Sequence, residues 1–103
     1  MSERPEPRRK RRGDVNYKVP DGVLRAELEG EEVMLNSATG VYHLLNKTGR
    51  FVIDSLQRGR SLDEAVDEIV ARSGTSHAQV MEDARSFVAA MLERGLIEEA
   101  PSR

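Results

Sequence analysis

The sequence contains no cysteine, and only two tyrosines and two phenylalanines supply aromatic rings among its 103 residues. Without cysteine the chain can form neither a disulfide framework nor a thiolate metal site, so a reducing cytoplasm is the expected location. No apolar run approaches the roughly 20 residues of a transmembrane helix, and no apolar segment follows the charged N-terminus as in a secretory signal. The composition therefore predicts a soluble intracellular protein.

Residue types that carry catalysis are present but are not arranged for it. His43 and His77 fall on different predicted elements, and neither has a metal ligand at a suitable spacing on a shared helix face. Ser76 precedes His77 at a predicted helix start, where no third group can orient a catalytic base. The glycines fall at turns and helix ends and form no phosphate loop. We therefore predict a protein that is not an enzyme and that holds neither a metal nor a cofactor.

Charge divides the chain into parts. Residues 1–12 carry six basic side chains against two acids, which leaves the remainder with a net charge of −6 to give the total of −2. A basic tract of this kind can bind nucleic acid or a membrane surface, but it is more often a solvated tail. We predict a disordered tail over 1–14, a folded domain over 15–99 and a disordered C-terminus over 100–103.

Alternating polarity predicts a small antiparallel sheet. In residues 23–29, VLRAELE, the apolar side chains fall on one side and the charged ones on the other, as in a half-buried strand. A short turn at 30–31 leads to a second strand within 32–35. Residues 41–45, VYHLL, are rich in β-formers and form the third strand. The resulting meander leaves its first and last strands at the edges.

The edges of this meander are where other chains can add. Residues 15–19 can pair at an edge, although Pro20 ends that segment, and a homodimer formed through them is left open. His43 is interpreted as an outward-facing residue of the last strand. A proline in its place is expected to remove one donor from the free edge.

Three capped amphipathic helices follow the strands, within residues 46–59, 61–74 and 76–95. Gly49, in the first turn of the first helix, indicates close approach of that helix to the sheet. The fold class is therefore α+β, a three-stranded antiparallel sheet followed by three helices, with a helical pair like the helix-turn-helix of winged-helix proteins.

That likeness introduces DNA binding as an alternative function. The third helix, however, holds three acids and only two arginines between residues 76 and 94, so it has no positive charge with which to neutralise phosphates. A winged-helix DNA-binding regulator that uses the basic tail therefore ranks below a protein-binding module.

Residues 23–97 resemble the family of pyrroloquinoline quinone biosynthesis protein D, whose members are also called RiPP recognition elements. The resemblance is carried by a hairpin followed by LNSATGVYHLLNKTG, by FVIDSLQRGRSLDEAVDEI, and by VMEDARSFVAAMLERGLIE, in which Asp83 stands four residues before Phe87. The order and spacing of these pieces make the assignment specific.

The resemblance implies a module that binds the leader segment of a ribosomally made precursor peptide. In that family the leader adds as an antiparallel strand to the third strand of the sheet and lies between that strand and the third helix. For the apolar residues among these implied contacts, the alternative role is packing in the core. Carried over by position, the contacts are Val41, Tyr42, His43, Leu44, Leu45, Val80, Asp83, Ala84, Arg85 and Phe87.

The variant TGVYHLLN looks most like stand-alone members from lasso-peptide gene clusters. That likeness implies a leader peptidase and a cyclase as partners in trans, whereas the quinone-cofactor branch works with a radical SAM enzyme. Tyr42 and Phe87 are otherwise expected in the core, as are Met34, Met81 and Met91.

Overall fold

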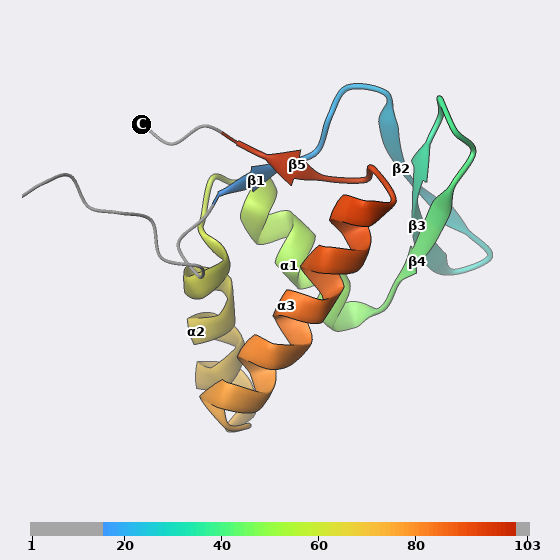
Figure 1. Cartoon of the computed structure of the whole chain (residues 1–103). Helices are drawn as coiled ribbons and strands as arrows, with labels where there is room; N and C mark the ends of the chain where they lie inside the picture. The colour runs from blue at the N-terminus through green and yellow to red at the C-terminus, as the bar shows by residue number, and fades with distance from the viewer. Residues whose placement is uncertain (1–15, 101–103) are drawn as a thin grey trace, which may run out of the picture.

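The computed structural model of the chain describes residues 16–100. The predicted basic tail over 1–14 and residues 101–103 of the predicted C-terminal segment lie outside the described residues. The predicted fold class is confirmed: three antiparallel strands precede three helices (Figure 1). The elements are β1 (Tyr17–Lys18), β2 (Val23–Leu28), β3 (Glu31–Asn36), β4 (Tyr42–Leu45), α1 (Lys47–Gln57), α2 (Leu62–Ser73), α3 (His77–Glu93) and β5 (Glu98–Glu99).

The main sheet has the strand order β2-β3-β4. A two-residue turn joins β2 to β3, and both of its residues have positive φ, 52° at Glu29 and 83° at Gly30. Turns of this kind match the twist of the flanking strands and fix their register, here with Leu28 opposite Glu31. The strand β4 pairs only with β3 among the described residues, so it forms one edge of the sheet.

The helix starts predicted from polar caps are confirmed. Asn46 accepts a hydrogen bond from the Gly49 N–H at 2.7 Å, and Ser61 and Glu64 form a complete capping box. Ser76 caps α3 by accepting a hydrogen bond from the Gln79 N–H at 3.1 Å, whereas the Gln79 side chain donates to Asp83 and does not complete a capping box. These local signals set where each helix begins and therefore how the three helices follow the sheet.

The core lies where the three helices meet one another and the inner face of the sheet. The methionines predicted to fill it, Met34, Met81 and Met91, are all buried. Leu96 and Ile97, which follow α3, are also buried and close the core at the C-terminal end. Burial of these side chains provides the main driving force for folding a domain of this size.

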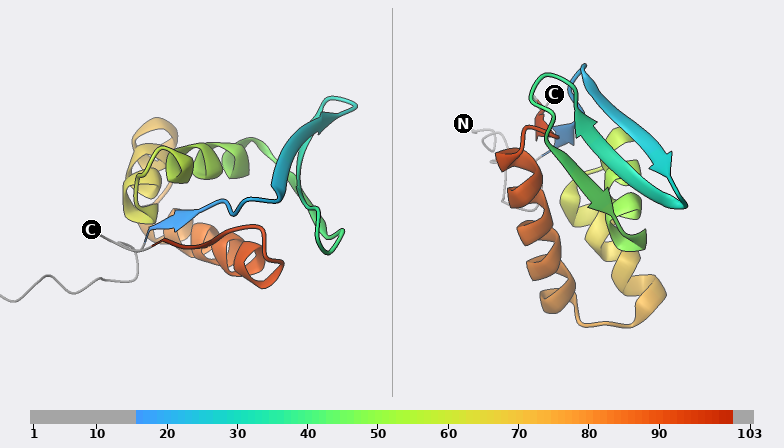
Figure 2. Two further views of the ribbon diagram at one scale, coloured as in Figure 1. Left: turned by 90° about the horizontal axis from the view of Figure 1, so that it is seen from above. Right: turned by 90° about the vertical axis from the view of Figure 1, so that its right-hand side faces the viewer.

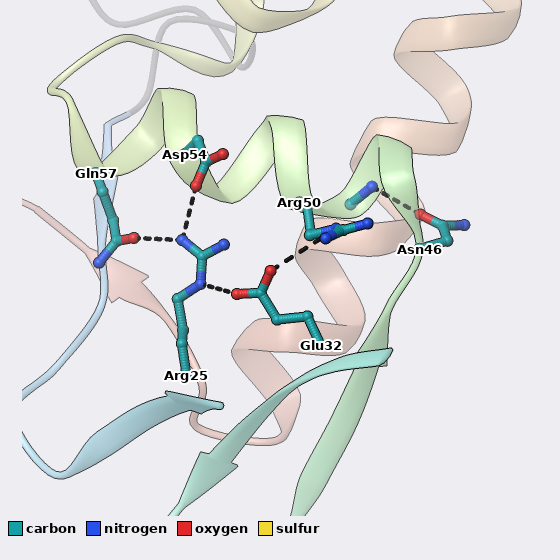
Figure 3. Close-up of polar contacts among 7 residues, drawn as sticks. Arg25, Glu32, Asn46, Arg50, Asp54 and Gln57 are labelled. Carbon is teal, nitrogen blue, oxygen red and sulfur yellow. Dashed lines mark hydrogen bonds and ion pairs between the residues drawn. The ribbon is translucent and has the colours of Figure 1, made fainter. Parts of the chain in front are cut away.

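The apolar alternation of β2 is real, but the apolar side faces away from the helices. Leu24 and Leu28 are 54% and 59% exposed, so the expectation that this strand buries them is wrong. Arg25 instead points inward and donates hydrogen bonds to Glu32 of β3 and, at 2.8 and 2.7 Å, to Asp54 and Gln57 of α1 (Figure 3). Polar contacts therefore connect this strand to α1.

The pKa of Arg25 is raised above its usual value, chiefly by the hydrogen bond to Glu32, with a smaller contribution from Asp54. Arg50 of α1 lies 3.7 Å from the same Glu32 carboxylate (Figure 3). A network of charged side chains therefore holds β2 and β3 against α1, where the sequence pattern predicts apolar packing.

The described part of the N-terminal segment, residues 16–19, does not cover an edge of the main sheet. Within the described chain, Tyr17 pairs with Glu99 and Lys18 with Glu98, so β1 and β5 form a separate two-stranded sheet (Figures 1 and 2). An ion pair of 3.4 Å joins Lys18 to Glu98. The strand β5 was not predicted. Its pairing with β1 ties the two ends of the described domain together, and within residues 16–100 no strand pairs with the outer side of β4.

Candidate functional site

The edge strand β4 begins at Tyr42, one residue later than predicted. Val41 lies just before it, and both of its backbone groups are bonded internally: its carbonyl accepts from the Asn36 N–H at 2.9 Å, and its N–H donates to Thr39 Oγ1 at 3.2 Å. Val41 therefore offers no free backbone group at the edge.

The hydrogen-bond pattern shows which residues of β4 face outward. In an antiparallel pair, opposed residues alternate between bonded and non-bonded positions. The bond from Asn36 to the opposite residue Val41 makes that position bonded, so the next bonded positions along β4 are His43 and Leu45. A proline at His43 would consequently break the sheet itself, and the earlier expectation that it would remove a free donor is wrong.

Tyr42 and Leu44 direct their backbone N–H and C=O groups away from β3. We call these four groups the open edge. The guanidinium Nη1 of Arg94 lies 3.5 Å from the Tyr42 carbonyl oxygen, which places the C-terminal end of α3 beside the open edge. Figure 2, right, shows β4 between β3 and α3, with β2 at the opposite edge of the sheet.

The side chain of His43 faces α3 and is half-buried, so its interpretation as an outward-facing residue is wrong. Its ring meets the ring of Phe87 edge to face, with centroids 5.9 Å apart and an interplanar angle of 71°. Burial lowers the pKa of His43, and the positive charge of Arg94, whose Nη1 lies 3.4 Å from His43 Nδ1, lowers it further. Both effects disfavour the protonated form of the imidazole.

One side of α3 lies along the open edge. Asp83, Phe87 and Arg94 are spaced four and seven residues apart, which places them on one side of the helix. Phe87 touches His43, and Arg94 touches both His43 and Tyr42. Sequence reasoning did not assign Arg94 to the site, although its spacing from the Asp83 and Phe87 pair could have indicated it.

A hollow of about 430 Å³ continues from the end of β4 between α1, α2 and α3. Four of the predicted residues of α3 line it, namely Val80, Asp83, Ala84 and Phe87. Asn46, the residue after β4, forms part of its opposite wall. Arg85 does not line the hollow, because two residues correspond to about 200° around the helix from Phe87.

Gly49 is buried at the point where α1 approaches Phe87. A Cβ at this position would lie 3.3 Å from Phe87 Cε1 and 3.2 Å from Asn46 Oδ1. The predicted close approach is present, but its partner is α3 and not the sheet. Phe87 is thus held between Gly49 on one side and His43 on the other.

The outer face of the sheet is apolar and uncovered within residues 16–100. A shallow hollow of about 590 Å³ there is lined by Leu28, Glu29, Glu31, Val33, Leu35, Tyr42 and Leu44. Tyr42 is 60% exposed, so the expectation that it belongs to the core is wrong, whereas Phe87 packs against the core while remaining partly accessible. Because side chains alternate, Tyr42 and Leu44 present their backbone to the open edge and their side chains to this face.

Among the described residues there is no group of three histidine or acidic side chains able to hold a metal ion. In the same part of the chain, no helix has the length and apolarity needed to span a membrane. The chemistry available at the site is therefore that of backbone hydrogen bonds, an apolar wall and two charged side chains.

Comparison with known proteins gives a family match and two similar structures. The model of the family described as Coenzyme PQQ synthesis protein D (PqqD) matches residues 31–97. The structure described as TbiB1 in complex with the TbiA(beta) leader peptide is 30% identical, with a TM-score of 0.71, over 82% of this chain and 99% of that one. No curated protein sequence matches.

A second structure, described as lasso peptide synthetase B1 complexed with the leader peptide, has a TM-score of 0.72 at 19% identity. It covers 84% of this chain and 99% of that one. At this identity the likeness establishes the shared fold.

Proposed function

The chain belongs to the family of coenzyme PQQ synthesis protein D, and from this membership we propose that it is a recognition element for the leader segment of a ribosomally made precursor peptide. The leader adds as an antiparallel strand to β4 and continues into the hollow beside α3. The similarity to TbiB1, whose structure holds the TbiA(beta) leader peptide, supports this function.

The observation that carries the proposal is the open edge. Tyr42 and Leu44 present two donors and two acceptors beside α3, and the described N-terminal segment pairs with β5 rather than with β4. An extended peptide satisfies such groups by strand addition, and each net hydrogen bond contributes about 1 kcal/mol. The backbone provides affinity that does not depend on sequence, so selectivity must come from the surrounding side chains.

We propose that the α3 side of the site supplies this selectivity. Val80, Ala84 and Phe87 form an apolar wall for alternate side chains of the leader, and Asp83 adds a charged side chain to the lining of the hollow. His43 supports Phe87 from the sheet. From their positions, Val41, Leu45 and Arg85 act at most indirectly, and Arg85 serves below as a control.

The proposed role is non-catalytic: the chain presents the bound leader to enzymes that act on the precursor, in the cytoplasm where such peptides are made. A leader peptidase and a cyclase in trans are the preferred partners, because the segment 39–46 resembles lasso-peptide members and the fold is that of a lasso peptide synthetase B1 protein. A radical SAM enzyme is the alternative partner. Pairing of two copies remains a prediction.

No described feature favours the DNA-binding alternative. The acids of α3, including Glu82 and Asp83, are exposed on the helix that would have to approach phosphates. The basic tail on which that alternative depends lies outside the described residues.

Titration of the ¹⁵N-labelled full chain tests the proposal. The probes are the TbiA(beta) leader peptide and the leader of any short precursor peptide found to be encoded near the gene, each with a scrambled peptide of the same composition as a control. Amide shifts centred on Tyr42, Leu44 and the Asp83 to Arg94 side of α3 are expected for the intact leaders alone. Shifts confined to β2 or to α2, or equal shifts with scrambled peptides, would contradict strand addition to β4.

A further inference from the structure

We infer that the site distinguishes bound peptides by the order of their charged side chains. It selects an extended peptide with a cationic side chain toward the N-terminal end and a carboxylate four or six residues later. We call this bound peptide the guest. This inference rests on the proposed function and names the class of peptide that the same site takes. Asp83 and Arg94 are the residues that determine the selection.

Asp83 and Arg94 are opposite charges that the described part of the chain leaves without an ion pair. Asp83 accepts one hydrogen bond, from the Gln79 amide at 3.2 Å. Within residues 16–100, the side chain of Arg94 makes only its long contacts to the Tyr42 carbonyl and to His43 Nδ1. By contrast, Arg25 has two carboxylate partners within the domain.

The two charges lie at opposite ends of the site. Asp83 lines the hollow together with Asn46, which follows the last residue of β4. Arg94 contacts Tyr42, the first residue of β4. A guest strand antiparallel to β4 has its N-terminal end near Asn46 and its C-terminal end near Tyr42. The acid therefore meets the N-terminal part of the guest, and the arginine meets the C-terminal part.

The distance between the charges sets the spacing in the guest. Eleven residues of α3 separate them, which at a rise of 1.5 Å per residue is about 16 Å. A strand advances about 3.3 Å per residue, so this distance corresponds to about five residues. Side chains on the same face of a strand are an even number of residues apart, so the matching separations are four and six.

The contacts of Arg94 also favour a carboxylate in the guest peptide. Without a guest its guanidinium lies at the Tyr42 carbonyl oxygen, an acceptor that an added strand needs. When a guest N–H takes that acceptor, the guanidinium keeps its contact to His43 Nδ1 and gains a charged partner only if the guest offers a carboxylate. A carboxylate fits its fork of donors best.

The same arrangement disfavours a guest in the wrong direction. A strand that adds parallel to β4 with this charge pattern places its cation at Arg94 and its carboxylate at Asp83. Like charges at both ends then oppose binding, and selectivity comes from repulsion as well as attraction.

Selection from a displayed library of random twelve-residue peptides, with the full chain as bait, tests the inference. Selected peptides are retained as edge binders if they shift the Tyr42 and Leu44 amides. Edge binders enriched in Lys or Arg followed four or six residues later by Asp or Glu are expected. Edge binders without this pattern, or with the reverse order, would overturn the inference while leaving the proposed function intact. If no peptide binds the edge, both fail.

Charge reversal on the protein tests the same point with matched controls. Asp83→Lys and Arg94→Glu are each expected to weaken an enriched peptide by about 3- to 10-fold, because a partly exposed attraction becomes a repulsion. Glu82→Lys and Arg85→Glu make the same charge changes elsewhere on α3 and should change affinity less than about twofold.

A second form of the enriched peptide has its cationic and acidic residues exchanged. The double variant Asp83→Lys/Arg94→Glu should bind this exchanged peptide more tightly than the original peptide. Retention of the original preference in the double variant would overturn the inference. Folding of all variants is checked by thermal unfolding, because both side chains are exposed and their reversal should leave the fold unchanged.

Discussion

The main sheet has two edges, and only one of them has the surroundings of a binding site. β2 is the longer edge strand, six residues against four in β4, and by the same alternation it directs the backbone of Val23, Arg25 and Glu27 outward. β4 lies beside α3, with Phe87 and a hollow next to it, whereas β2 lies at the far edge (Figure 2). In the proposed function, therefore, unpaired backbone alone is not sufficient for binding, and the helix beside β4 supplies the selectivity.

The two edges also differ in charge. The shallow surface beside the β2 edge is lined by Arg25, Ala26, Glu27 and Glu32, and Arg25 is engaged by Asp54. Charged residues along an edge strand discourage the addition of another chain. On the outer face both edge strands expose apolar side chains, Leu24 and Leu28 on β2 and Tyr42 and Leu44 on β4. The two strands differ on the inner face, where β4 carries His43 and Leu45. The difference indicates that β2 is protected against pairing and β4 is kept available.

The largest effect is expected from proline at each edge. Leu44→Pro removes an outward N–H and places the proline ring where the leader must lie, so leader binding should fall by about 100-fold or more. Glu27→Pro removes an outward N–H from β2 and should leave binding within about twofold. Fluorescence anisotropy with labelled TbiA(beta) leader peptide measures both.

Two controls accompany the proline variants. Leu44→Thr keeps the backbone donor and should retain binding within about threefold, and urea unfolding checks that Leu44→Pro is folded. Equal loss of binding in Leu44→Pro and Glu27→Pro would mean that the two edges are not different in function.

A smaller effect, on stability alone, is expected from the network behind β2. Arg25→Met keeps the apolar stem and removes the hydrogen bonds to Glu32, Asp54 and Gln57, so the free energy of unfolding should fall by about 1 to 3 kcal/mol. Leader affinity, measured at a temperature where the variant is folded, should stay unchanged. Weaker leader binding in the folded variant would show that the β2 side takes part in recognition.

The smallest effect is expected on the pH dependence of folding stability, through His43 at the β4 edge. The pKa of His43 is lowered in the folded state by burial and by Arg94, so the unfolded chain binds the proton more readily. The stability that neutral His43 contributes is therefore present above its unfolded pKa and is lost as the pH falls through the lower folded pKa.

Urea unfolding at about pH 7.5 and about pH 5.5 measures this loss. His43→Gln should reduce the difference between the two conditions. His77→Gln, at an exposed position near Asp67, serves as a comparison. An unchanged pH dependence in His43→Gln would show that His43 is not the group responsible.

The order of the three main strands and the three helices could be predicted because its signals are local. Asn46, Ser61 and Ser76 set the helix starts within a few residues of sequence, and Gly30 sets the hairpin. The face of the sheet that packs on the helices could not be predicted. Alternation gives two sides without saying which is inside, and the choice depends on Arg25 meeting Asp54, 29 residues away.

The location of the proposed site comes from the family resemblance, and its details depend on contacts that the sequence does not show. Sequence placed Val41 to Leu45 at an edge, but only the register with β3 distinguishes Tyr42 and Leu44 from His43 and Leu45. Arg94 was missed because its contact with Tyr42 joins residues 52 apart. The pairing of Tyr17 with Glu99, which leaves β4 open, is a contact of the same long-range kind.

Amide hydrogen exchange of β4, with and without the TbiA(beta) leader peptide, is the most direct measurement of whether a guest strand completes this sheet. In the free protein His43 and Leu45 should be protected while Tyr42 and Leu44 exchange rapidly, and saturation with the peptide should slow Tyr42 and Leu44 by about 10-fold or more. Protection of Tyr42 and Leu44 in the free protein, or rapid exchange of both in the saturated complex, would contradict strand addition at this edge.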